Sequence, residues 1–301
     1  MTYLITGATG FVGRQLVEHL LAEGHSVQYL GRKRDRTMDL RAAFHLWENP
    51  SGSPPALNAV PRCDAVIHLV GEPIAQRWTP EIKRKIFDSR VKSTRNLVEA
   101  IATLRHKPSV LVSASAIGFY GDRGDQVLTE RDHAGNGFLA ELCTAWEREA
   151  DLTSEYGLRV IKIRVGVVLG SQGGALKKIL PLFRAGLGGR LGSGRQWVSW
   201  IHESDLVRAI CWAADRSDVS GAVNGCAPQP VTNEEFTKTL AQILHRPAIL
   251  PAPKLALRFL LGEMADFLFD SIRVVPAVLE SGGFNFKYRN LRDALAAIVG
   301  N

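Results

Sequence analysis

Hydrophobic and polar positions follow two different periods along the first 170 residues. Continuous apolar, β-favouring runs at 3–6, 26–30, 64–71, 109–113 and 158–169 predict buried strands, and 43–47 predicts a shorter one. Between these runs, apolar residues recur at helical spacing in 11–22, 93–103 and 139–152. Alternating strands and helices are typical of an α/β fold, so we expect a Rossmann-type, doubly wound parallel sheet with helices on both faces.

The pattern changes after residue 169. Residues 170–194 are rich in glycine around one amphipathic segment at 175–185, and 232–295 alternates two or three helical segments with proline-containing joints. Between these regions lie a strand at 196–201, a helix at 203–214 capped by Ser204 or Asp205, and a strand at 222–224. We therefore expect a nucleotide-binding domain over 1–169, to which the chain returns near 197–226, and a smaller C-terminal substrate domain made mainly of 170–301.

The composition excludes several classes of partner. The 301-residue chain is 46% hydrophobic and 22% charged with a net charge of +7, which is ordinary for a globular protein. Its basic clusters at 32–36 and 83–92 do not form a run interleaved with aromatic residues of the kind that stacks bases, so we expect no nucleic-acid partner. No apolar run approaches the ~18 residues of a membrane span, so we expect no membrane association. These features predict a cytoplasmic monomer or homodimer whose four scattered cysteines are free thiols.

The first turn of the chain carries the strongest chemical signal. Gly7, Gly10 and Gly13 follow the first strand directly, at a three-residue spacing, and open the first helix. Glycines at these positions allow a sharp turn, close approach of the backbone to a pyrophosphate and tight packing of helix on strand. The helix N-terminus then presents N–H donors and a positive dipole end to the phosphates. We predict a dinucleotide site formed by the residues Gly7, Thr9, Gly10, Phe11, Val12 and Gly13.

The form of the dinucleotide is indicated by the end of the second strand. A site for NAD usually has an acidic residue there, whereas arginine accommodates the 2′-phosphate of NADP. Arg32 occupies the position here, so we predict NADP(H). Two alternatives stay open: a solvated run of charge, or Arg32 stacked on the adenine of NAD. Further cofactor contacts are expected at Leu69, Gly71 and Ser113, where the next two strands end.

Longer motifs extend this pattern over nearly the whole chain. Together they resemble the extended, or atypical, short-chain dehydrogenase/reductase superfamily, which includes epimerases and dehydratases of nucleotide sugars. Within it the chain is similar to the NAD-dependent epimerase/dehydratase-like "epimerase family proteins", some of which are labelled cell-division inhibitors. The motifs are GATGFVG (7–13), DAVIHLVG (64–71), GEPIAQRW (71–78), RVKSTRNLVEA (90–100), SASAIGFYGD (113–122), GFLAELCTAWE (137–147), IRVGVVLG (163–170), GLGGRLGSGRQWVSWIH (186–202), WIHESDL (200–206) and GFNFKY (283–288).

The resemblance implies a catalytic serine, together with a tyrosine and a lysine four residues apart on the following helix. Ser115 matches the serine. Aligning Glu147 with the glutamate that usually follows the lysine places Leu139 at the tyrosine position and Cys143 at the lysine position. The usual proton-transfer pair is therefore absent. We predict that Ser115 and Tyr120, in the same turn, orient or protonate a substrate oxygen; the alternative is that Tyr120 only shapes the pocket.

Substrate contacts are predicted from Glu72 and from the glycine-rich second part of the chain. Arg195, Trp197 and Trp200 there are suited to holding an anion and stacking on a ring, although a loop with two core tryptophans explains the same residues. The expected function is an NADP(H)-dependent oxidoreductase or epimerase acting on a small, anionic, nucleotide-sugar-like substrate. Loss of the Tyr/Lys pair leaves a non-catalytic NADP(H)-sensing regulatory protein as the alternative.

Overall fold

The computed structural model describes residues 1–249 and 251–300, and a seven-stranded sheet organises them. All neighbouring strands in this sheet are parallel, in the order β11-β7-β5-β4-β1-β2-β3. This arrangement confirms the predicted Rossmann-type sheet, including the strand expected at 222–224. The strands are β1 (Thr2–Thr6), β2 (Ser26–Gly31), β3 (Ala43–Leu46), β4 (Ala65–His68), β5 (Val110–Ala116), β7 (Arg159–Val165) and β11 (Gly221–Gly225).

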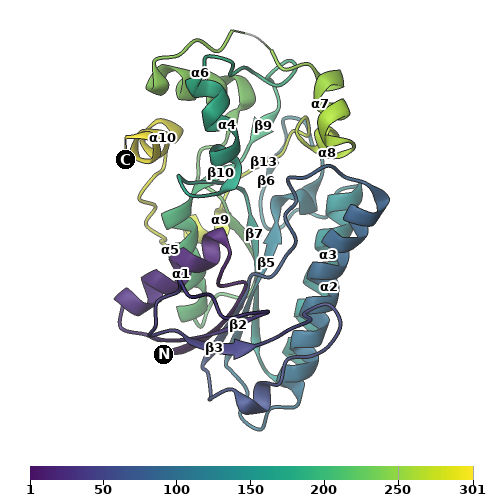
Figure 1. Ribbon diagram of the computed structural model, residues 1–301, viewed down its shortest axis with the longest axis vertical. Helices are drawn as coiled ribbons and strands as arrows, with labels where there is room; N and C mark the ends of the chain where they lie inside the picture. The colour runs from purple at the N-terminus through teal and green to yellow at the C-terminus, as the bar shows by residue number, and fades with distance from the viewer. Residues whose placement is uncertain (250, 301) are drawn as a thin grey trace.

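Helices cover both faces of the sheet (Figure 1). On one face lie α1 (Phe11–Ala22) and α5 (Glu203–Asp215), which pack on Ile5 and Ile67. On the other lie α2 (Pro80–Ala102) and α3 (Phe138–Asp151), over Leu4 and Val66. Successive strand residues alternate between the two cores, which explains why the central strands are apolar without interruption.

The order of the strands reverses at β1. The chain runs from β1 to β2 and β3 on one side, and returns to the other side of β1 with β4, β5, β7 and β11. In open α/β sheets, ligands bind outside the carboxyl ends of the strands at such a reversal. The turn after β1 and the loop after β4 therefore define the edge where a site is expected.

Helix α2 is more than twice as long as the helix predicted at 93–103. Its N-cap is Thr79, whose hydroxyl accepts a hydrogen bond from the backbone N–H of Ile82 at 3.2 Å, and Pro80 occupies the first turn. The first half of α2 is charged, and the basic run at 83–92 lies on it. The prediction used only Leu97, Val98 and Ile101, which all lie in the second half.

The apolar run at 158–169 contains two strands where one was predicted. After β7 the chain leaves the sheet at Gly166 and forms β8 (Val167–Leu169), which pairs with β10 (Trp200–His202). Gly166 permits the break, because a Cβ there would lie 2.8 Å from the carbonyl oxygen of Ser199. The predicted strand at 196–201 is likewise divided into β10 and β9 (Trp197–Val198).

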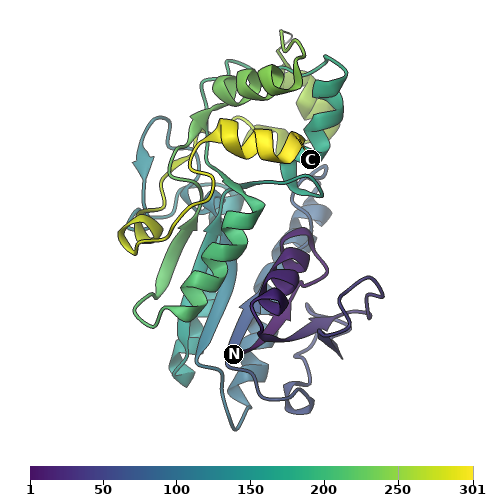
Figure 2. The same cartoon turned by 90° about the vertical axis from the view of Figure 1, so that its left-hand side faces the viewer.

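A second apolar core lies beyond the carboxyl edge of the sheet, in the upper part of Figures 1 and 2. Its helices α4 (Gly174–Arg184), α6 (Asn233–Leu244) and α10 (Leu291–Val299) pack together. The described part of the tail holds five helices, more than the two or three expected, because α8 (Met264–Phe267) and α9 (Ala277–Ser281) are too short to show a periodic pattern. The remaining elements are α7 (Lys254–Leu261), α8 (Met264–Phe267), α9 (Ala277–Ser281), β6 (Val127–Leu128), β12 (Val231–Thr232), β13 (Arg273–Val274) and the 3-10 turns η1 (Leu57–Ala59), η2 (Ile117–Tyr120) and η3 (Leu152–Tyr156).

The cap of α5 differs from the prediction. His202 is the N-cap, and its Nδ1 accepts a hydrogen bond from the backbone N–H of Ser204 at 3.1 Å. Asp205 instead accepts the backbone N–H groups of Lys287 and Tyr288 at 2.9 and 2.8 Å. Asp205 thus fastens the C-terminal segment to α5. In the described part of the chain, no helix combines the length and hydrophobicity needed to cross a membrane.

Candidate functional site

The turn after β1 accepts only glycine at two positions. Gly7 has φ +73°, and a Cβ on it would lie 2.7 Å from the carbonyl carbon and oxygen of Leu69, at the end of β4. A Cβ on Gly13 would lie 2.2 Å from the carbonyl oxygen of Gly7. The turn, α1 and β4 are therefore packed backbone to backbone, which brings the N-terminus of α1 to the reversal point of the sheet.

The N-terminus of α1 is free to bind an anion. Its N-cap, Gly10, provides no side-chain hydrogen bond, and the first turn holds no acidic residue. The first backbone N–H groups, those of Phe11, Val12 and Gly13, have no partner within a helix of this geometry. Thr9 and Gly10 are exposed beside them. Free N–H donors at a helix N-terminus are suited to an anion such as a pyrophosphate.

The side chain of Phe11 faces a different neighbour. A Cβ on Gly173 would lie 2.3 Å from Cγ of Phe11, and one on Gly170 would lie 2.6 Å from its Cζ. The glycine-rich loop that precedes α4 therefore lies directly on the Phe11 ring. This contact brings the second part of the chain next to the N-terminus of α1.

The end of β2 carries uncompensated positive charge. Arg32, Lys33 and Arg34 are exposed. The nearby acidic residue, Asp35, is already engaged: Thr37 donates to it through backbone and hydroxyl, Arg14 pairs with it, and these bonds lower the pKa of its carboxyl. The arrangement fits a phosphate group better than a ribose hydroxyl that needs an acidic acceptor.

The ends of β4 and β5 supply the next predicted contacts. Leu69 is part-buried, and its backbone N–H donates to the carbonyl oxygen of Thr6 at 3.1 Å. Ser113 is 1% exposed, and its hydroxyl donates to the carbonyl oxygen of Ala114 at 3.2 Å. Beyond β4, the backbone N–H of the half-buried Glu72 donates to Oγ of Ser89 at 2.9 Å, which ties this loop to α2.

His68, within β4, belongs to the core. It is 0% exposed, and burial lowers its pKa to about 3, so the ring is neutral at physiological pH. Its Nδ1 lies 2.7 Å from the hydroxyl oxygen of Thr6. The ring thus links β4 to β1 below the site.

Ser115 and Tyr120 do not lie on the surface of the site. Tyr120 is 0% exposed; its hydroxyl donates to Oδ1 of Asn224 at 2.7 Å and accepts from Nη1 of Arg164 at 3.0 Å. Ser115 is 3% exposed and donates to Oε1 of Glu147 at 2.7 Å. Burial also raises the pKa of Tyr120 to about 12. In this arrangement both hydroxyls donate to protein partners, so neither is free to donate a proton to a substrate.

The two hydroxyls join a buried ion pair that the sequence analysis missed. Arg164, on β7, donates through Nε and Nη2 to the two carboxylate oxygens of Glu147, at 2.8 and 2.9 Å. The guanidinium also lies 3.5 Å from the centroid of the Phe119 ring. Burial opposes the charge on Arg164, but the bonds to Glu147 raise its pKa above the ordinary value. The network fixes β5, β7 and α3 relative to one another.

Leu139 and Cys143 occupy the two α3 positions at which the superfamily has its tyrosine and lysine. Leu139 packs on Gly118, where a Cβ would lie 3.0 Å from the Leu139 Cβ. Cys143 is 1% exposed, and burial raises the pKa of its thiol to about 12. All four cysteines are buried and free, as predicted. Neither α3 position carries a group that exchanges a proton near neutral pH.

Of the three residues predicted to bind substrate after position 170, only Arg195 is exposed. Trp200 is 0% exposed in the second core, and its indole N–H donates to the carbonyl oxygen of Gln229. Buried in this way, Trp200 has no exposed ring face on which a substrate could stack. Trp197 is half-buried, and the guanidinium of Arg273 lies 4.0 Å from its ring centroid.

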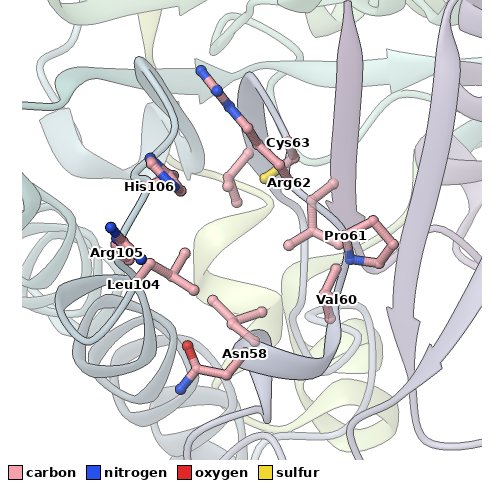
Figure 3. A pocket seen from close by; sticks show the side chains of 11 residues that line it. Asn58, Val60, Pro61, Arg62, Cys63, Leu104, Arg105 and His106 are labelled. Atoms are coloured by element: carbon pink, nitrogen blue, oxygen red, sulfur yellow. The ribbon is translucent and has the colours of Figure 1, made fainter.

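A cavity of about 170 Å³ lies at the opposite, amino-terminal edge of the sheet (Figure 3). Leu104, Val60 and the buried Cys63 line it, with Arg62 and His106 at its rim. Because the turn at Gly7 lies at the other end of the strands, this cavity is not part of the candidate nucleotide site. Among residues 1–249 and 251–300, no group of His, Cys, Asp and Glu side chains is arranged to hold a metal ion.

Comparisons with known proteins agree with this geometry. The NAD dependent epimerase/dehydratase family matches residues 3–224, and a domain of unknown function, DUF1731, matches residues 252–298. An epimerase family protein SDR39U1 homolog from Arabidopsis thaliana, described as chloroplastic, is 41% identical over 311 aligned residues, which cover 99% of this chain and 87% of that protein.

Solved structures extend the likeness to three dimensions. Human epimerase family protein SDR39U1, determined with NADPH, superposes with a TM-score of 0.90 at 32% identity, and each chain covers 100% of the other. UDP-glucose 4-epimerase from Thermus thermophilus, determined with NAD, shares the fold at a TM-score of 0.79 and 21% identity, over 100% of this chain and 98% of that one. The chain therefore belongs to the NAD dependent epimerase/dehydratase family and, within it, to the epimerase family proteins.

Proposed function

We propose that this protein binds NADP(H) and uses it to oxidise, reduce or epimerise a small anionic substrate at the carboxyl edge of the sheet. One observation carries the proposal: the glycine cradle at the N-terminus of α1 lies beside a β2 end whose exposed cations pair with no carboxylate among the described residues. The NADPH in the human relative, which shares 32% of its residues with this chain, supports it.

The chain offers a group for each part of the dinucleotide. The backbone N–H groups that open α1 would hold the pyrophosphate, and Arg32 would hold the 2′-phosphate. Leu69, Gly71 and Ser113 would line the nicotinamide half. When bound, the cofactor supplies hydride transfer.

The substrate side of the site would come from Glu72 and from the second part of the chain. We assign residues 1–169 with 197–226 to a cofactor domain, and the rest of 170–301 to a substrate domain. Exposed Arg195, together with the net charge of +7, favours an anionic substrate over a neutral one. The half-buried Trp197 would serve as a wall of the substrate site.

A second function, NADP(H) sensing without catalysis, is favoured by a separate observation. Leu139 and Cys143 replace the proton-transfer pair, while the hydroxyls of Ser115 and Tyr120 are committed inside the protein. A sensor must bind NADPH and NADP with different affinity in two conformations, because a ligand with equal affinity for both shifts no equilibrium.

One set of measurements separates the two functions. Titration with NADPH and NADP is expected to show binding of both, and Arg32→Ala is expected to weaken NADPH at least tenfold while changing NADH little. Screening for NADPH consumption against aldehydes, ketones and nucleotide sugars then tests catalysis. Turnover supports the first proposal; tight, redox-selective binding with no turnover supports the second; no binding of either nucleotide refutes both.

A further inference from the structure

Arg90 occupies an unusual place in the middle of α2. Its guanidinium lies against the end of the β4 loop: a Cβ on Gly71 would lie 2.8 Å from both Cζ and Nη2 of Arg90. On the α3 side, Cζ of Arg90 lies 5.3 Å from the centroid of the Trp146 ring. The group is therefore held between α2, α3 and the carboxyl edge of the sheet, in the region where α2 and α3 run side by side in Figure 1.

Most of the hydrogen-bonding capacity of Arg90 is unused. Nη1 reaches the carbonyl oxygen of Ile86 at 3.3 Å and Oγ of Ser89 at 3.5 Å, which are long contacts. Its Nε and Nη2 donate to none of the described residues, and no described carboxylate lies within 4.0 Å of the group. The buried indole N–H of the adjacent Trp146 is likewise without a partner in the described part of the chain.

The unused donors of Arg90 contrast with the donors of Arg164, a buried arginine with a structural role. Arg164 donates to both oxygens of Glu147 and to the hydroxyl of Tyr120, so its charge is compensated within the protein. Burial lowers the pKa of Arg90 to about 10, yet the group is still a cation at neutral pH. A partly buried cation with free donors gains most from a ligand that supplies acceptor oxygens.

The position of Arg90 along the sheet indicates which part of a ligand it meets. The strands β2, β1, β4 and β5 are neighbours in that order in the sheet. The proposed cofactor site has the 2′-phosphate at the end of β2 and the pyrophosphate at the end of β1. Gly71 follows β4 and Cys143 packs beside β5, so Arg90 lies on the nicotinamide side. Cys143, which lies near Arg90, occupies the position of the superfamily lysine.

We propose that Arg90 donates hydrogen bonds to the ribose hydroxyls of the nicotinamide nucleotide, so that α2 supplies the cation that α3 lacks. The inference rests on the proposed binding of NADP(H). It makes Arg90 a cofactor-binding residue with no counterpart among the residues predicted from the sequence. The guanidinium would also bring a fixed positive charge next to the reacting end of the cofactor.

Calorimetric titration with two ligands tests the proposal. NADPH contains the nicotinamide nucleotide, whereas 2′,5′-ADP contains only the adenosine half with its 2′-phosphate. Arg90→Gln is expected to weaken NADPH at least tenfold and to leave the affinity for 2′,5′-ADP within twofold of the wild type. Arg95→Gln is the matched control on the same helix, because Arg95 pairs with Glu149 on α3; it is expected to change neither affinity.

Each result has a defined meaning. Unchanged NADPH affinity in Arg90→Gln overturns the proposal and leaves a substrate anion as the ligand of Arg90. Equal weakening of both ligands overturns it too, since that pattern reports damage to the fold. Arg90→Lys keeps the charge and is expected to lose less affinity than Arg90→Gln; equal losses would show that packing, not the cation, matters. If the wild type binds neither ligand, the proposed function itself fails, and the inference falls with it.

Discussion

Two glycines of the first turn are expected to fail in different ways when each is replaced by alanine. A Cβ on Gly13 would lie 2.2 Å from the carbonyl oxygen of Gly7 and 2.7 Å from Cα of Ala8. Carbon contacts become favourable only near roughly 3.5 Å, so the methyl group would overlap backbone atoms that no rotamer change can move. A Cβ on Gly10 would meet only the Gly7 carbonyl oxygen, at 3.2 Å, and the residue is exposed with φ −75°.

Two contributions to the free energy of unfolding have opposite signs for Gly13→Ala. Replacing glycine by alanine inside a helix normally stabilises a protein by about 1 kcal/mol. Overpacking typically costs about 1–3 kcal/mol, and the upper end applies when the obstruction is backbone. We expect a net loss of about 2 kcal/mol in the free energy of unfolding for Gly13→Ala. For Gly10→Ala we expect a change below about 1 kcal/mol, but a methyl group on the surface that a pyrophosphate must approach.

Urea denaturation followed by NADPH titration measures both effects. Gly13→Ala is expected to shift the unfolding midpoint to lower urea. Gly10→Ala is expected to unfold like the wild type and to bind NADPH at least tenfold more weakly, a loss of about 1.4 kcal/mol. Wild-type stability in Gly13→Ala, or wild-type NADPH affinity in Gly10→Ala, would refute this division of roles.

Three further predictions concern buried groups. Tyr120→Phe leaves both partners of the phenol unpaired, so urea denaturation should show a loss of about 1–3 kcal/mol with NADPH affinity retained; the opposite pattern would return Tyr120 to the site. Below pH ~6.5 the unfolded chain protonates His68 while the native state, with its pKa of about 3, does not, so acidification should cost up to about 1.4 kcal/mol per pH unit from this group. His68→Gln should flatten that slope, and equal slopes would contradict the assignment. Burial raises the pKa of Cys63 to about 11 and of Cys143 to about 12, so a chromogenic disulfide reagent should label these thiols rapidly only after unfolding; rapid labelling of the native protein would refute their burial.

The sequence predicted the elements whose pattern is set by burial on the sheet. The apolar runs that became β1, β2, β4 and β5 were located correctly, because strands buried on both faces are mainly apolar and carry few polar residues. The first half of α2 was missed because that half is charged, and the short helices α8 and α9 because four or five residues show no period.

The site residues that act through backbone geometry could be predicted from the sequence. Those that act through side-chain hydrogen bonds to distant residues could not. Gly7 and Gly13 act through steric exclusion, which depends on residue type and spacing alone. Ser115 acts through Glu147, 32 residues away in the sequence, and Tyr120 through Asn224, 104 residues away. Nothing in the local sequence indicates such pairings, so residues at the expected strand end were interpreted as exposed.

The loss of the usual pair on α3 and the burial of Ser115 are linked physically. A serine at the end of β5 becomes a proton donor only if a neighbouring group leaves its hydroxyl free and polarised. Here the carboxylate of Glu147 accepts a hydrogen bond from the Ser115 hydroxyl and its charge is balanced by Arg164, so the polar groups of β5, β7 and α3 satisfy one another. On α2, by contrast, Arg90 pairs with no carboxylate among the described residues. Because the Ser115 hydroxyl is committed to Glu147, replacing Ser115 by alanine should alter the free energy of unfolding more than nucleotide affinity, as urea denaturation and NADPH titration would show.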